Sequence, residues 1–354
     1  MPTNGQPLHD QPSNDRYCRQ QQFAPIGEDG QRRLRQSDVA VLGCGALGTV
    51  AAELLCRAGA GRIRIIDRDI VEWSNLQRQS LFDGADASAG TSKAEAAATR
   101  LAEINDTVEL RPLVVDVRAD NIESLLAGVD LVVDATDNFQ VRFLLNDWAL
   151  ATGTAWVHGG CVGASGQVRL FDGAGRPCFR CLVPQPPPPD AVETCDTAGV
   201  LGSATHAIAS LQVTEAIKWL TGNHDAISQD VVSIDFWHNR TRRVSLTEDA
   251  APTCVACRQR RFEFLHGQQR SQTETELCGR NAIQITPVEP RIVDLAALAK
   301  RWGKAGATQQ TRFFVRLQID ATTQLTLFRD GRVIVSGTDE IARARSLVDR
   351  YVGS

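Results

Sequence analysis

Residues 39–48 read VAVLGCGALG, and this stretch decides the fold. Its first four residues are apolar and indicate a buried parallel strand, and the residues from Ala46 onward indicate the start of a helix. Between them, Gly43, Gly45 and Gly48 are spaced as Gly-x-Gly-x-x-Gly. These glycines permit a tight turn and let the backbone approach a phosphate at the helix N-terminus, where free N–H groups collect. The stretch therefore predicts a nucleotide-binding turn.

An acidic residue after the next strand supports this interpretation. Asp67 ends the apolar stretch RIRIID, about where such folds place the carboxylate that binds a ribose hydroxyl. The identity of the nucleotide stays open at this point, because a nicotinamide dehydrogenase and an ATP-consuming enzyme can both begin in this way.

Strand and helix patterns alternate from residue 39 to about 160, which predicts an α/β fold: a doubly wound, Rossmann-like, mostly parallel sheet with right-handed crossovers. After the first strand we expect strands at 62–66, 108–115 and 129–135, and helices near 46–58, 92–104, 121–127 and 138–150. Strand-like stretches at 154–160 and 166–172, separated by glycines, predict an antiparallel extension of the sheet. A helix at 203–222 and strands at 230–237 and 241–247 are expected after it.

The length of 354 residues allows roughly two domains. We expect a mobile tail at 1–15, a nucleotide-binding domain at 16–265, a linker at 266–279 and a small α+β domain of unassigned role at 280–354. The proline run PQPPPPD, 184–190, begins a long exposed crossover loop over 184–201, because it suits neither helix nor ladder strand. In the small domain, Asp330-Gly331 predicts a hairpin.

The overall composition narrows the class of protein. The net charge is 38 − 42 = −4 at pH 7, so we expect no nucleic-acid partner. The first 15 residues are polar, and no run approaches the ~18 apolar residues of a membrane helix, so we expect neither export signal nor membrane association. Ten cysteines in such a chain indicate a reducing cytoplasm, with thiols used for metal binding or chemistry.

Two basic residues favour ATP over a nicotinamide. Hydride transfer develops little charge on the phosphates, whereas cleavage of a phosphoanhydride needs cations around the departing pyrophosphate. Arg78, with Asn75 as a polar neighbour, can supply one cation. Ser92 and Glu95 have capping-box spacing, which makes Lys93 the first residue of a helix, where a cation is unfavourable unless an anion lies there. An ordinary surface arginine and a solvated lysine remain the alternatives for each residue alone.

A carboxylate follows the next buried strand, in the stretch VVDATDN. The carboxyl ends of parallel strands form the ligand crevice of such folds, so Asp137 there suits a hydrated magnesium ion bridging phosphates. Asp137 and Gln140 also have capping-box spacing, so we expect Asp137 to begin the next helix as well. Together with the acid and the two cations above, this carboxylate suits ATP with Mg²⁺. His158 is interpreted as a packed histidine rather than a catalyst.

Four cysteines form two C-x-x-C pairs, Cys178 with Cys181 and Cys254 with Cys257, separated by 72 residues. Four thiolates suit a tetrahedral structural zinc site, and a thioredoxin-like redox motif is the alternative for either pair alone. Because the pairs flank the crossover loop and the last strands of the first domain, we favour zinc.

Cys195 lies in the crossover loop, in the stretch ETCDTAGVLG, which is too polar and glycine-rich to be core. The thiol is therefore expected to be accessible, although Glu193 and Asp196 disfavour its thiolate. The remaining cysteines have no metal-ligand spacing and are interpreted as passive.

The order of these motifs resembles the ThiF/MoeB/HesA family, the bacterial relatives of the ubiquitin-activating enzymes. The resemblance rests on Gly-x-Gly-x-x-Gly, DRD, SNLQRQ, SK and DATDN, and it covers about residues 15–260. It implies ATP-dependent adenylylation of the C-terminal glycine of a small ubiquitin-like sulfur carrier by a homodimer. The family pattern RYxRQ is matched by RYCRQ, which implies that Arg19 reaches ATP in the partner subunit.

The resemblance also implies roles for the residues named above: Asp67 on ribose, Asn75, Arg78 and Lys93 on phosphates, Asp137 on magnesium, and zinc at the paired cysteines. For Cys195 it implies a covalent link to the carrier or a role in sulfur transfer. The stretch CGRNAIQI and the domain after it are similar to extended ThiF-type proteins, which favours thiamine over molybdopterin biosynthesis; the sulfur donor is not identified.

Two functions of other classes stay open. A nicotinamide-dependent oxidoreductase is disfavoured by Arg78, Lys93 and the cysteine pairs. An inactive binding subunit is disfavoured because every matched ATP residue is retained.

Overall fold

The computed structural model describes residues 16–175, 177–187, 198–246, 251–267, 274–277, 281–287 and 292–353. These residues form two compact units. The first holds residues 16–187 and 199–267 of the described chain, and the second holds residues 274–353 together with Ala198. In this described part of the chain, no helix combines the length and the apolar character needed to cross a membrane.

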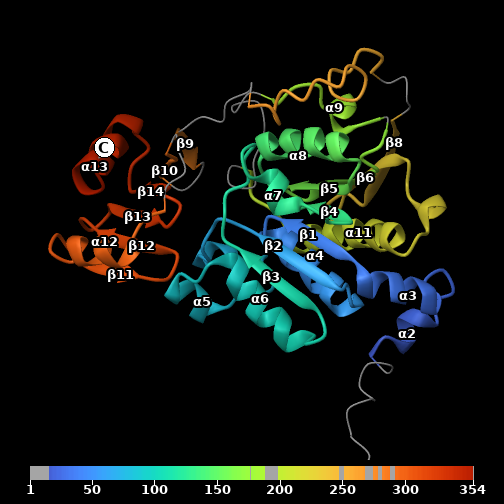
Figure 1. Cartoon of the computed structure of the whole chain (residues 1–354), viewed down its shortest axis with the longest axis horizontal. Coiled ribbons are helices and arrows are strands. Elements are labelled where there is room, and N and C mark those ends of the chain that lie inside the picture. Colours follow the sequence, from blue (N-terminus) through green and yellow to red (C-terminus); the bar gives the residue numbers. More distant parts are fainter. Residues whose placement is uncertain are drawn as a thin grey trace, which may run out of the picture. The chain divides into compact units, whose positions relative to one another are not determined.

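An eight-stranded sheet with the order β3-β2-β1-β4-β5-β6-β7-β8 is the centre of the first unit (Figure 1). Its strands are β1 Asp38–Leu42, β2 Arg62–Ile66, β3 Glu109–Leu113, β4 Leu131–Asp134, β5 Ala155–Val162, β6 Ser165–Phe171, β7 Asp230–Asp235 and β8 Arg240–Ser245. The pairs from β3 through β5 are parallel, and the pairs from β5 through β8 are antiparallel. The predicted mostly parallel sheet with an antiparallel extension is confirmed.

Helices cover both faces of this sheet (Figure 1). The longer ones are α3 Gly27–Gln36, α4 Ala46–Ala58, α6 Lys93–Ile104, α8 Phe139–Thr152 and α11 Gly202–Leu220, and the shorter ones are α2 Cys18–Gln21, η1 Trp73–Asn75, α5 Gly84–Ala89, α7 Ile122–Leu126, α9 Phe179–Leu182 and η3 His224–Ala226. The predicted helices are present with ends shifted by a few residues. Helix α3 was not predicted, because Leu34 is its one large buried apolar residue and leaves no periodic signal.

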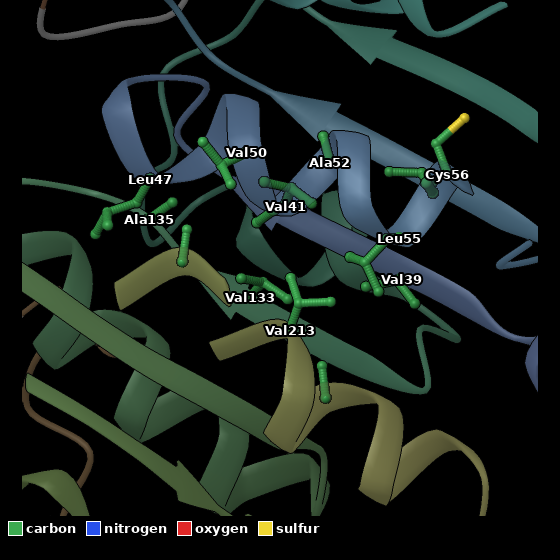
Figure 2. Packing of buried hydrophobic residues seen from close by; sticks show 14 of the residues in the cluster. Val39, Val41, Leu47, Val50, Ala52, Leu55, Cys56, Val133, Ala135 and Val213 are labelled. Atoms are coloured by element: carbon green, nitrogen blue, oxygen red, sulfur yellow. The ribbon is translucent and has the colours of Figure 1, made fainter. Parts of the chain in front are cut away.

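Strand β1 explains why the opening stretch is continuously apolar. Val39 and Val41 belong to the core that packs against α4 and α11, whereas Ala40 and Leu42 belong to the core beneath α7 and α8. Figure 2 shows the two valines beside residues of both covering helices, with Val213 contributed by α11. Because both faces of the strand are buried, its apolar residues are consecutive and do not alternate with polar ones as in a half-exposed strand.

The second unit is a six-stranded sheet with the order β11-β12-β13-β14-β10-β9. Its elements are β9 Glu274–Leu277, β10 Ala282–Ile285, α12 Leu295–Trp302, β11 Thr308–Gln310, β12 Phe314–Gln318, β13 Gln324–Phe328, β14 Val333–Ser336 and α13 Ile341–Tyr351. The predicted hairpin is formed by β13 and β14, with Gly331 at φ 87° in the turn. Strand β9 corrects the expected linker: its backbone pairs with β10, and such pairing needs no apolar periodicity.

Candidate functional site

The glycine turn joins β1 to α4, and its three glycines have different tasks. Gly43 has φ 86°, and a Cβ there would lie 2.8 Å from the carbonyl oxygen of Ala135. A Cβ on Gly48 would collide with the carbonyl oxygen of Gly43, so this glycine permits close packing of helix on turn. Beside Gly45 the nearest atom to such a Cβ would be Nε2 of Gln79, at 3.9 Å. The middle glycine therefore leaves space for a phosphate at the N-terminus of α4.

Asp67 follows β2 and is tied directly to this turn. Its Oδ2 accepts the backbone N–H of Cys44 at 2.6 Å, and its Oδ1 accepts the N–H of Asp69 at 2.7 Å. Burial raises the pKa of Asp67, and the nearby Lys93 ammonium opposes that shift. Each carboxylate oxygen can accept a further hydrogen bond, so the side chain keeps the capacity to bind a ribose hydroxyl.

Lys93 begins α6, as predicted, and Ser92 is the N-cap, with its Oγ accepting the N–H of Glu95 at 3.3 Å. The Lys93 side chain is 5% exposed, and its Nζ lies 3.5 Å from Oδ2 of Asp69. The N–H of Asp69 donates to Asp67, which also accepts the N–H of Cys44 in the glycine turn, so a buried cation lies close to the turn. The same ammonium opposes the rise in the pKa of Asp67. A cation at a helix N-terminus is favourable when an anion lies beside it.

The loop after β2 carries the other predicted phosphate residues. Asn75 is buried, and its Oδ1 accepts the N–H of Glu72 at 2.9 Å, so half of its amide holds the loop itself. Arg78 is half-buried and donates to the carbonyl oxygen of Ser74 at 2.8 Å.

Gln79 lies beside the glycine turn and is not among the predicted site residues. It is 4% exposed, its Nε2 faces the middle glycine of the turn, and its Oε1 has no hydrogen-bond partner among the described residues. Buried polar atoms normally have hydrogen-bond partners, so an unpaired amide oxygen beside an open turn is typical of a residue that binds a ligand. The signal was present in the sequence, since Gln79 is the last residue of SNLQRQ.

Asp137 lies after β4 and is exposed, but it is not the helix cap that its spacing predicted. Asn138 caps α8 instead, because its Oδ1 accepts the N–H groups of Gln140 at 2.8 Å and Val141 at 3.4 Å. The Asp137 carboxylate is thereby left outside the helix, and its oxygens are of the kind that Mg²⁺ prefers. It is also near Arg68: burial opposes the charge of that guanidinium, but Asp116, Asp69 and Asp137 hold its pKa above the ordinary value.

Arg19 lies far from the glycine turn of its own chain. Its neighbour Gln20 donates to the carbonyl oxygen of Ala58 at 3.0 Å, at the C-terminal end of α4. The glycine turn is at the other end of this 13-residue helix, about 20 Å away at 1.5 Å per residue. Arg19 itself is exposed and donates to Gln22.

The four paired cysteines meet in a second site, which we call the cysteine cluster: Cys178, Cys181, Cys254 and Cys257. Their sulfur atoms all lie within 4.8 Å of one another, with separations of 3.8 Å between Cys178 and Cys254 and 3.5 Å between Cys181 and Cys257. Zinc–sulfur bonds of about 2.3 Å in a tetrahedron separate sulfur atoms by about 3.8 Å. The arrangement therefore fits a four-coordinate metal, whereas disulfide sulfurs lie about 2 Å apart.

Helix α8 ties both halves of the cysteine cluster to the core. The N–H of Phe179 donates to Oδ1 of Asn146 at 3.0 Å, and the N–H of Phe264 donates to Oδ2 of Asp147 at 3.0 Å. Burial raises the pKa of Asp147 to about 6. Adjacent residues of one buried helix thus fix segments that are far apart in the chain.

Cys195 lies outside the described residues. The end of the crossover loop is described, and it pairs with the turn between β5 and β6: Gly163 donates its N–H to Gly199 at 3.0 Å, and Leu201 donates to Gly163 at 2.8 Å. A Cβ on Gly202 would lie 3.1 Å from the carbonyl oxygen of Gln77. The loop therefore ends against the segment that carries Arg78.

Comparisons with known proteins show which family the chain belongs to. The ThiF family model matches residues 17–256. The chain is 40% identical over 341 residues to a sulfur carrier protein ThiS adenylyltransferase of Bacillus subtilis, which covers 96% of this chain and 99% of that protein. It is 38% identical over 248 residues to a sulfur carrier protein adenylyltransferase of Thermus thermophilus, covering 69% of this chain and 90% of the relative.

Two further similarities cover only part of the other protein. Adenylyltransferase and sulfurtransferase MOCS3 of Aedes aegypti is 39% identical over 68% of this chain, which spans about half (55%) of that protein's length. The crystal structure of E. coli MccB with ATP shares the fold, with a TM-score of 0.59 at 19% identity over 69% of this chain and 75% of that one.

Proposed function

This chain belongs to the ThiF family, and on that premise we propose that it adenylylates the C-terminal glycine of a ubiquitin-like sulfur carrier. The observation that carries the proposal is the buried Lys93 ammonium, which lies 3.5 Å from Asp69 in the segment that Asp67 joins to the glycine turn. A nicotinamide enzyme needs no such cation, whereas cleavage of ATP does. The similarity over 99% of a ThiS adenylyltransferase supports a sulfur carrier as the acceptor.

In the proposed reaction, an oxygen of the terminal glycine carboxylate attacks the α-phosphorus of ATP. The bond from the α-phosphorus to the bridging oxygen breaks, which yields an acyl-adenylate and pyrophosphate. The carboxylate is already nucleophilic, so the protein contributes positioning and charge neutralisation rather than a general base.

The residues divide this task along the edge formed by the carboxyl ends of the parallel strands, which we call the nucleotide edge: Gly43, Gly45, Gly48, Asp67, Asn75, Arg78, Lys93 and Asp137. We assign ribose to Asp67 and the phosphates to Arg78 and Lys93. The NH₂ group of Asn75 joins them, while its oxygen holds the loop. Asp137 would hold a hydrated Mg²⁺, which neutralises phosphate charge when bound.

We further propose a homodimer in which Arg19 completes the site of the partner subunit. The position of α2 at the far end of α4 supports this, because Arg19 is too distant from its own glycine turn to contact ATP there. The cysteine cluster would hold a structural Zn²⁺, since four protein thiols leave no open position for chemistry. Reduced thiol ligands and an ATP substrate both suit the cytoplasm.

Two finer assignments depend on the similarity alone. The extended relative of B. subtilis supports thiamine biosynthesis as the pathway, with the molybdopterin sulfur carrier as the alternative. Cys195 in the crossover loop is proposed to accept the carrier covalently or to take part in sulfur transfer after adenylylation.

ATP–pyrophosphate exchange with two purified sulfur carriers, one from each pathway, tests the proposal. We expect exchange with the thiamine-type carrier, and none when its terminal glycine is deleted. Exchange with the molybdopterin-type carrier alone would reassign the pathway. ATP binding without exchange for either carrier would identify an inactive binding subunit. Binding of NAD instead of ATP would identify an oxidoreductase.

A further inference from the structure

A buried polar cluster lies directly behind the proposed magnesium ligand. Asp134, the last residue of β4, is fully buried, and its Oδ2 lies 3.2 Å from Nε of Arg142 and 3.1 Å from Nδ1 of His158. Arg142 comes from α8 and His158 from β5, so three elements converge on one carboxylate. We call these three residues the Asp134 cluster.

Two residues of the Asp134 cluster form hydrogen bonds with Thr136, the residue before Asp137. Oδ1 of Asp134 accepts the backbone N–H of Thr136 at 3.1 Å and its hydroxyl at 2.7 Å. Nη2 of Arg142 donates to the carbonyl oxygen of Thr136. Both backbone polar groups and the side chain of Thr136 are therefore fixed by buried charged groups.

The His158 ring has one protonation state that satisfies its contacts. Its Nε2 lies 3.3 Å from Nε2 of Gln167, an amide nitrogen that can only donate, so the ring proton is on Nδ1 and donates to Asp134. Burial lowers the pKa of His158, which keeps the ring neutral. Burial also opposes ionisation of Asp134, but Arg142 and the hydrogen bonds from His158 and Thr136 hold its pKa below the usual value. The Asp134 cluster therefore contains one buried ion pair, Asp134 with Arg142, and one neutral hydrogen-bond donor, His158.

The segment that contains Ala135 and Thr136 packs against the glycine turn. A Cβ on Gly43 would lie 2.8 Å from the carbonyl oxygen of Ala135 and 3.3 Å from Cα of Thr136. Asp137 follows at once, exposed and outside the helix cap that Asn138 provides. The Thr136 backbone before it and the Asn138 cap after it therefore set where the Asp137 carboxylate begins, beside the glycine turn.

We propose that Asp134, Arg142 and His158 are positioning residues, which fix the Thr136 backbone and thereby hold the Asp137 carboxylate in the orientation that binds Mg²⁺ with ATP. The inference rests on the proposed function, in which Asp137 is the magnesium ligand. Groups that orient a metal ligand in this way typically change metal affinity 10- to 100-fold when they are lost.

The test measures metal dependence apart from turnover. Thr136→Val keeps the side-chain shape and loses the hydroxyl donor, His158→Leu loses the ring donor, and His158→Asn can keep an N–H donor near the position of Nδ1. Binding of a non-hydrolysable ATP analogue is measured by calorimetry with and without Mg²⁺, and Mn²⁺ binding to the same complex by electron paramagnetic resonance. We expect Thr136→Val and His158→Leu to weaken the metal-dependent part about tenfold, with metal-free analogue binding within about twofold of wild type and substantial rescue in His158→Asn.

Wild-type metal dependence in Thr136→Val would overturn the inference. If His158→Leu does not fold, the result for Thr136→Val alone decides the test. Equal losses with and without Mg²⁺ would also overturn it, because they indicate general damage to the fold. Asp137→Asn distinguishes failure of this inference from failure of the magnesium assignment on which it rests. If it loses metal dependence while the cluster variants keep theirs, the inference alone fails; if Asp137→Asn keeps wild-type metal dependence, the magnesium assignment fails and the inference with it.

Discussion

The nucleotide edge and the cysteine cluster are both polar sites, but they are assembled differently. Residues of the nucleotide edge follow successive strands of one sheet, and several of them, such as Asp137, remain partly or fully exposed. The sulfur atoms of the cysteine cluster come from two segments that are separated by 72 residues of sequence, and both segments donate backbone hydrogen bonds to side chains of α8. Side chains left accessible can bind a substrate, whereas thiols that surround one another can bind only an ion. We therefore expect changes at the first site to alter activity and changes at the second to alter stability.

Loss of a cysteine ligand should have the largest effect. Cys178→Ser should release the metal and lower the free energy of unfolding by roughly 5 kcal/mol or more, since binding energy at a structural zinc site is folding energy. Metal content after chelator-free purification and denaturant unfolding check this. Cys56→Ser, a buried thiol outside the cluster, should retain the metal. Wild-type protein without zinc would remove the distinction between the two sites.

Asp137→Ala should show the opposite pattern. We expect ATP–pyrophosphate exchange to fall at least about 1,000-fold, or roughly 4 kcal/mol, because the proposed magnesium ligand is lost. The free energy of unfolding should stay within about 0.5 kcal/mol of wild type, since Asn138 and not Asp137 caps α8. The matched variant Asn138→Ala should lose about 1 kcal/mol of stability. Exchange near the wild-type rate in Asp137→Ala would contradict the magnesium assignment.

Asp147 lets pH probe the support of the cysteine cluster, with Asp147→Asn as the reference because thiolate–metal binding also depends on pH. Burial raises its pKa to about 6 in the folded state, against about 3.9 in an unfolded chain. Between these values the folded protein binds a proton that the unfolded chain has released, so stability falls as pH rises from 4 to 6. At 1.36 kcal/mol per pKa unit, the contribution is roughly 2 to 3 kcal/mol. Chemical unfolding of wild type and Asp147→Asn at pH 4, 5, 6 and 7 isolates it; parallel curves for the two proteins would refute the shifted pKa.

Arg19→Ala tests whether the nucleotide edge is complete within one chain. We expect exchange to fall roughly 30-fold, since one cation near the phosphates is lost. Mixing it with Lys93→Ala should restore about a quarter of wild-type activity, because half of randomly formed dimers carry one site with both residues intact. Absence of complementation, once subunit exchange is verified, would argue for a site within one chain.

Cys195→Ala should have the smallest effect on adenylylation. The α-phosphate chemistry uses cations and no thiol, so exchange should stay within about twofold of wild type. A thioester-linked enzyme–carrier adduct, which forms when the thiol attacks the acyl-adenylate carbonyl and releases AMP, should disappear from gels of enzyme with carrier and ATP. An adduct that persists in the variant would identify another cysteine as the acceptor. A collapse of exchange in the folded variant would join the crossover loop to the nucleotide edge.

Local sequence signals predicted most of the fold and much of the nucleotide edge. The glycine spacing, the apolar strands and the Ser92 cap depend on residues within a few positions of one another, and the structure forms all of them. Where two local interpretations competed, the sequence could not choose. Asp137 and Asn138 are both good caps, and the structure selects Asn138 while the buried Asp134 holds Thr136 in place just before them.

What the sequence by itself determined is the order of most of the strands and helices, with α3 and β9 among the exceptions, the nucleotide turn and the presence of two thiol pairs, because these follow from short-range sterics, hydrogen bonding and hydrophobic periodicity. The sequence left two alternatives for the thiol pairs, a shared zinc site or separate redox motifs, and the tertiary structure brings the four thiols together as the zinc interpretation requires. Only the tertiary structure showed that Arg19 lies at the far end of α4, and that His158 joins Asp134 and Arg142 behind Asp137. These facts depend on contacts between residues far apart in the chain, and such contacts leave no periodic trace in the sequence. They exist because buried charges and donors must find partners wherever packing brings elements together.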